Sequence, residues 1–156
     1  MLLLSALLAM AATDPAAAPA PTPTLSLAVA ETDRQDDPRP APCGPDGSCG
    51  DSLFRARFTG GKVIAGAPLP PAFEARLRLH TPLITRSTLA LIVERQSDGS
   101  LLVLRRAGFN GRTGIACFRE PDEAPVAWRP EGRDVRIEGN SLCVFDAAQI
   151  DPDAPR

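Results

Sequence analysis

Side chains suited to stacking and to acid–base chemistry are scarce in this sequence. It contains no tyrosine, one tryptophan (Trp128) and one histidine (His80) in 156 residues. Few side chains are therefore available to stack on bases or sugar rings. A catalytic triad is not indicated either, because there is only one imidazole and no G-x-S-x-G motif. We expect no catalytic residues and no enzyme activity. The alternative is a small hydrolase or lyase that uses carboxylates among the 19 acidic residues.

A strong net charge is also missing. The formal net charge of −2 argues against nucleic acid as a partner. Lysine is nearly absent, since Lys62 is the only one among 17 basic residues. The stretch from Asp51 to Asp146 contains 14 basic and 11 acidic residues, so a mildly basic domain follows an acidic N-terminal part.

Metal and phosphate motifs have no clear match. The four cysteines form no C-x2-C pair, so zinc is not favoured, and we expect no metal and no cofactor. The loop from Gly108 to Gly114 reads G-x-x-G-x-x-G, which is neither a P-loop nor a dinucleotide-binding fingerprint. It is interpreted as a wide hairpin connection, with an anion-binding nest of backbone N–H groups beside Arg112 as the alternative.

The N-terminal third indicates export. Residues 1–12, MLLLSALLAMAA, have the length and apolarity of a signal peptide, with a cleavage pattern at Ala9-Met10-Ala11 and a later one at Ala28-Val29-Ala30. Residues 13–42 are rich in proline and alanine and are expected to be a disordered spacer. A β domain is expected over 43–147 and a disordered tail over 148–156. The protein is expected in the periplasm or the medium, with no stable transmembrane segment after processing.

The even number of cysteines in an exported chain indicates disulfides. Cys43 and Cys49 flank Gly-Pro-Asp-Gly-Ser, a turn-forming stretch that a local bridge closes easily. The remaining pair is then Cys117 with Cys143, both within predicted strands.

Apolar and polar residues alternate with the period of a β-strand over 53–65 and over Phe73 to His80. A continuous apolar run over 88–95 indicates a central strand, which Ser97–Ser100 connects to a strand over 101–105. Further strands are expected over 115–119, 134–138 and 141–145. So many short strands predict an all-β fold, and a small, partly open barrel of the OB type is preferred over a β-sandwich. The first barrel strand is expected to be long and bent at Gly60-Gly61.

The strand over Phe73 to His80 also gives a candidate binding site. If its apolar residues are buried, the pleat sends Arg76, Arg78 and His80 to the opposite face. Arg55 and Arg57 on the preceding strand could extend this patch, and Arg112 is a further candidate ligand for an anion. The competing interpretation is a solvated face on which arginine stems cover apolar surface.

The stretch from Cys43 to His80 resembles the start of netrin-like domains, the OB-type module of tissue metalloproteinase inhibitors. The resemblance rests on the cysteine-rich entry, the strand Asp51-Ser52-Leu53-Phe54-Arg55-Ala56-Arg57 and the second alternating strand. It implies a fold but not inhibition, because those inhibitors bind the protease metal with an N-terminal cysteine and Cys43 follows a long spacer. In organisation the chain is also similar to small exported proteins of Gram-negative bacteria, which implies no activity.

These observations together predict an exported, non-enzymatic β domain that binds a partner at the cell envelope, either a protein or an anionic component. Binding of an anionic small molecule or envelope polymer through the arginines is the alternative within the same class.

Overall fold

The computed structural model describes residues 24–36, 38–40, 52–80, 82–119, 128 and 130–153. Within these ranges the chain forms two β-sheets and one short 3₁₀ helix. In chain order the elements are β1 (Leu25–Gln35), β2 (Arg39–Pro40), β3 (Ser52–Gly66), β4 (Phe73–Leu79), β5 (Thr88–Arg95), β6 (Leu101–Gly108), β7 (Ile115–Arg119), β8 (Val135–Glu138), β9 (Ser141–Phe145) and η1 (Ala147–Gln149). No helix in these ranges is long and apolar enough to cross a membrane.

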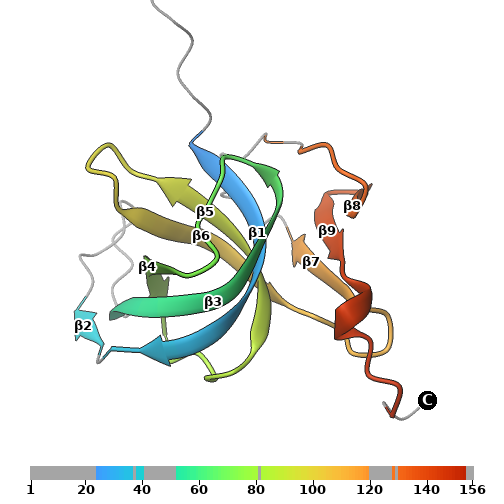
Figure 1. Ribbon diagram of the computed structural model, residues 1–156, viewed down its shortest axis with the longest axis horizontal. Helices are drawn as coiled ribbons and strands as arrows, with labels where there is room; N and C mark the ends of the chain where they lie inside the picture. The colour runs from blue at the N-terminus through green and yellow to red at the C-terminus, as the bar shows by residue number, and fades with distance from the viewer. Residues whose placement is uncertain are drawn as a thin grey trace, which may run out of the picture.

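Five strands close into a barrel in the order β1-β5-β6-β4-β3 (Figure 1). The barrel closes because β1 pairs along one edge with β5 and along the other with β3. All these pairings are antiparallel except that of β4 with β6, which is parallel. The all-β fold and the small OB-like barrel expected from the sequence are therefore confirmed.

The barrel interior is filled by alternate residues of its strands. On β4 every second residue is buried, with Phe73, Ala75, Leu77 and Leu79 inside, and the residues between them are exposed or half-buried. The ring of Phe73 packs on that of Phe58 from β3, with centroids 5.2 Å apart. The strand β3 changes direction at Gly60, whose φ of 63° is rarely adopted by other residues. The bend expected at Gly60-Gly61 is thus present, although β3 is the second barrel strand and not the first.

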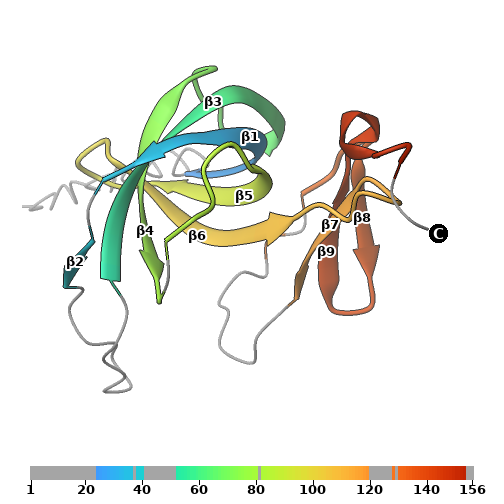
Figure 2. The ribbon, with the colours of Figure 1, turned by 90° about the horizontal axis from the view of Figure 1, so that it is seen from below.

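The second sheet has the order β7-β9-β8 and lies against the outside of the barrel (Figure 2). Cys117 on β7 and Cys143 on β9 are register partners, and their Cα atoms lie 4.0 Å apart. The predicted disulfide between them is confirmed. The predicted Cys43–Cys49 bridge and the signal peptide over 1–12 lie outside the described residues.

A second hydrophobic core joins this sheet to the barrel. Its buried members come from the outer faces of β1 and β5 and from the inner face of the second sheet: Leu27, Val29, Ala90, Ile92, Ala116, Phe118, Leu142 and Val144. This explains why β5 is apolar at almost every position: one of its faces lines the barrel and the other supports the second sheet.

The expected domain limits require correction at both ends. The spacer was expected to reach residue 42, but Leu25–Gln35 forms β1, which belongs to both cores. Its first half, Leu-Ser-Leu-Ala-Val-Ala, has no proline and is buried on both faces, which removes the alternation that marks a half-buried strand. The later cleavage pattern at Ala28-Val29-Ala30 lies inside this strand. At the other end, η1 continues past residue 147, and the N–H of Asp151 donates to the carbonyl of Gly111.

Candidate functional site

The outer surface of β3 and β4 carries a group of arginines, which we call the arginine face: Arg55 and Arg57 on β3 and Arg76 and Arg78 on β4. The pleat places them outside because the alternate residues of both strands fill the barrel. Arg55 and Arg76 are direct register partners, whereas Arg57 is opposite Glu74. The pairing of β3 with β4 thus brings together Arg55, Arg57, Arg76 and Arg78, as the alternation of both strands predicted.

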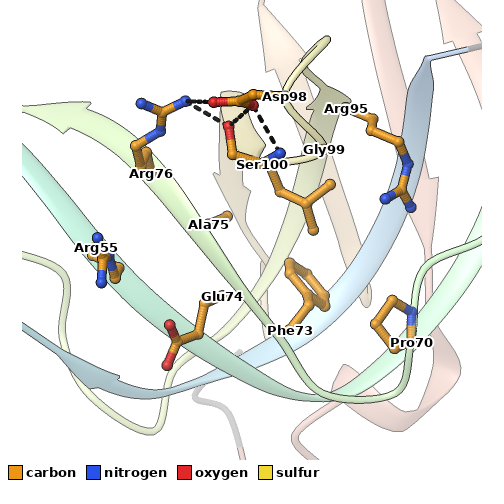
Figure 3. Close-up of a pocket in the computed structure, with 11 residues that line it drawn as sticks. Arg55, Pro70, Phe73, Glu74, Ala75, Arg76, Arg95, Asp98, Gly99 and Ser100 are labelled. Carbon is orange, nitrogen blue, oxygen red and sulfur yellow. Dashed lines mark hydrogen bonds and ion pairs between the residues drawn. The ribbon is translucent and has the colours of Figure 1, made fainter.

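A cleft of about 560 Å³ opens at one end of this face, where β4 begins and the β5–β6 hairpin turns (Figure 3). We call it the hairpin cleft. Its charged lining residues are Arg55, Glu74, Arg76, Arg95 and Asp98. Figure 3 shows Arg76 extending toward the turn that carries Asp98 and Ser100. Sequence reasoning did not include Arg95, Asp98 or Ser100 in the site, because they belong to a hairpin that is distant in sequence from β3.

Arg76 is held in place by this turn. Its Nη2 donates a hydrogen bond of 2.6 Å to Ser100 Oγ and lies 3.9 Å from Asp98 Oδ2. The Ser100 hydroxyl and backbone N–H both donate to Asp98 Oδ1, at 2.6 and 2.9 Å. Arg76 therefore has a fixed position and keeps part of its guanidinium exposed.

The Asp98 carboxylate in this cleft has a lowered pKa. The hydrogen bonds from the Ser100 hydroxyl and N–H lower its pKa below the ordinary value of 3.8, and the positive charge of Arg76 adds to this effect. A general acid at neutral pH needs a shift in the opposite direction. The direction of this shift is that of a carboxylate that holds Arg76 in place, not that of a general acid.

Arg55 differs from Arg76 in its partners, although Glu74 lines the same cleft. Among the described residues its guanidinium makes no ion pair, although it lies directly opposite Arg76. Like charges at directly opposed positions of two strands destabilise the pair. An anion bound between them would remove this repulsion, and two guanidinium groups offer it paired N–H donors.

The other predicted site residues have different positions. The strand ends at Leu79, so His80 follows β4 as an exposed residue and is not part of the strand. Arg112 lies in the turn between β6 and β7 and lines neither the hairpin cleft nor the groove at the other end of β4. The arginine face therefore unites Arg76 and Arg78 but does not include Arg112.

The glycine-rich loop does not offer a free anion nest. The N–H of Arg112 donates to Asn110 Oδ1, and the N–H groups of Thr113 and Gly114 donate to the carbonyl of Asn110. These donors are used within the turn, and Gly114 supplies the positive φ of 62° that the turn requires. The structure supports the interpretation of this loop as a hairpin connection.

Within the described ranges no group of three or more His, Cys, Asp or Glu side chains is placed to hold a metal ion. Comparison of the chain with protein-family models, with curated proteins and with solved structures found no match.

Proposed function

We propose that this protein is an exported, non-enzymatic domain that binds an anionic polymer of the cell envelope through its arginine face. The observation that carries the proposal is the opposed pair Arg55 and Arg76 at the edge of an open cleft. One member of the pair is fixed by the Asp98–Ser100 turn, and the other makes no ion pair among the described residues.

Export is supported by the apolar leader over residues 1–12 and by the disulfide between Cys117 and Cys143. Such bridges persist in oxidising compartments and are rare in the cytosol. An exported protein of this kind would meet the polymers of the cell envelope, and this location is part of the proposal.

The surface chemistry favours a polymer recognised by its charges over a protein partner. Protein interfaces depend on a few buried aromatic or aliphatic anchors. The exposed large apolar residues of the described ranges are Ile84, Ile137 and Ile150, and none of them lines the hairpin cleft. Beside the apolar Pro70, Phe73 and Leu101, the cleft presents guanidinium groups, which bind phosphate and carboxylate groups through paired hydrogen bonds.

The fold gives supporting evidence by analogy. In OB-type barrels the surface of the second and third strands, together with the loop between the last two, commonly binds oligosaccharides or oligonucleotides. The corresponding elements here are β3, β4 and the β5–β6 turn, which together line the hairpin cleft. Fold analogy alone does not establish function, so the arginine geometry carries the argument.

Titration with a phosphorylated polysaccharide, a carboxylated polysaccharide and polyglutamate tests the proposal. We expect the double variant R55Q/R76Q to bind the preferred polysaccharide at least tenfold more weakly than the wild type, and binding by the wild type to fall as salt rises. The control is R133Q/R136Q, which removes the same charge from exposed positions near and on β8 and should change affinity less than twofold. Equal affinities of R55Q/R76Q and the wild type would refute the proposal, and preferential binding of polyglutamate would assign the face to acidic proteins.

A further inference from the structure

The parallel seam between β4 and β6 is the least complete pairing of the barrel. It consists of two register pairs, Arg76 with Leu102 and Leu77 with Val103. By contrast, β3 and β4 are paired over seven positions. The ladder ends where β6 has an irregularity: Ile92 pairs with Arg105 and Val93 with Val103, so that Leu104 is an extra residue. Beyond this bulge β4 and β6 are no longer paired.

A groove of about 320 Å³ follows the end of this ladder, and we call it the seam groove. Its charged lining residues are Arg78, Arg105 and Arg106, and no acidic residue lines it. None of the three arginines makes an ion pair with another described residue. The seam groove therefore collects three positive charges that no ion pair within the described part of the chain compensates.

Arg105 and Arg106 reach this groove from the two faces of β6. Arg105 is half-buried and is the register partner of Ile92, which belongs to the second core. Arg106 is the register partner of Leu91, whose side chain is in the barrel core, and yet Arg106 is exposed. Both line the groove beside the end of the β4–β6 ladder. Their position beside Arg78 could not be predicted from the sequence, because it depends on where the parallel pairing of β4 and β6 ends.

We infer that the seam groove is a phosphate subsite, formed by Arg78, Arg105 and Arg106, that receives a phosphate group of the bound polymer. A carboxylate has two oxygens, which one guanidinium can satisfy by two parallel hydrogen bonds. Three guanidinium groups offer more donors than one carboxylate can accept, whereas a phosphate has three or four oxygens for them. The groove is therefore better matched to phosphate than to carboxylate.

This inference rests on the proposed function, because β4 connects the two sites. Arg76 lines the hairpin cleft and Arg78 lines the seam groove. They are alternate residues of one strand, about 7 Å apart along it. A polymer bound on the arginine face can therefore place one of its charged groups in the seam groove.

The test is titration of the full domain with inorganic phosphate and, separately, with acetate, followed by amide chemical shifts. We expect phosphate to shift the residues of the seam groove and to bind at least tenfold more tightly than acetate. The variant R105Q/R106Q should weaken phosphate binding at least tenfold, while R133Q/R136Q should change it less than twofold. If R105Q/R106Q fails to fold, R78Q serves the same purpose with one exposed substitution. Unchanged phosphate affinity in the folded variant would overturn the inference.

Two further experiments distinguish this inference from the proposed function and identify the source of the phosphate. R55Q/R76Q should lose polymer binding but retain, within twofold, the affinity for inorganic phosphate measured from the amide shifts of the seam groove. If R105Q/R106Q binds phosphate like the wild type while R55Q/R76Q loses the polymer, the subsite is refuted and the proposed function stands. Loss of binding by R105Q/R106Q to a phosphorylated polysaccharide supports a glycan phosphate. Loss of binding to phosphatidylglycerol vesicles instead supports the same subsite with a lipid headgroup.

Discussion

The disulfide between Cys117 and Cys143 allows a quantitative test of the second sheet. The bridged residues are separated by 26 positions. For a loop of that length the loss of conformational entropy in the unfolded chain stabilises the folded state by about 3.5 kcal/mol at 25 °C. We expect the variant C117A/C143A to lower the free energy of unfolding by about this amount. Alanine is the appropriate replacement because Cys143 is almost fully buried and serine would bury a hydroxyl group.

Urea denaturation measures this change with two independent probes. Trp128 is the only tryptophan and packs against the second core, so its fluorescence reports on the contact between barrel and sheet. Far-UV circular dichroism reports on the strands of both sheets. Coincident transitions would show that both parts unfold together, which the shared core predicts. A loss of less than about 1 kcal/mol in C117A/C143A would refute the loop-entropy reasoning. Non-reducing peptide mapping of the wild type should also find the predicted Cys43–Cys49 peptide.

Three further predictions concern the cores and the hairpin turn. F118A should lower the free energy of unfolding by about 3–5 kcal/mol, because it leaves a cavity in the second core. The control I137A, on the exposed part of β8, should change it by less than about 0.5 kcal/mol. Urea denaturation measures both values. T32V should leave the free energy of unfolding unchanged or raise it by up to about 1 kcal/mol, because the buried hydroxyl of Thr32 has no hydrogen-bond partner in the described part of the chain. A decrease of more than about 1 kcal/mol would contradict this reasoning. The lowered pKa of Asp98 means that its bonds stabilise the fold above the ordinary value of 3.8 and are lost as the pH falls through the lowered pKa. A carboxyl NMR titration should therefore find a higher Asp98 pKa in S100A, and an unchanged value would show that the hydroxyl is not its main cause.

Period-two alternation made most of the barrel predictable. It identified β3 and β4, where one face meets the core and the other meets water, and it fixed which face carries Arg76 and Arg78. The turn residues Gly139 and Asn140 likewise marked the hairpin of β8 and β9. The Cys117–Cys143 pairing followed from the short spacing of the other two cysteines.

For β1 no comparable signal was present in the pattern of residues. Its buried half is apolar on both faces, and it follows a stretch rich in alanine and proline, so composition indicated a spacer. A strand of this kind is recognisable only when the partners on both of its faces are known. The same limit applies to the candidate site. The pleat predicts the arginine face, but the hairpin cleft requires the position of Asp98, and the seam groove requires the point at which the β4–β6 ladder ends.

The burial of β1 between two layers has a consequence for the order in which the nascent chain can fold. β1 is made first, but it pairs with β5, more than 50 residues later, and its outer side chains Leu27 and Val29 are covered by β7 and β9. Until the C-terminal hairpin has been synthesised, a partly made barrel exposes an apolar stripe. Because such distant contacts form slowly, the emerging chain should remain unfolded until nearly all of it is available. A protein cut after β6 should accordingly aggregate instead of forming a smaller stable barrel.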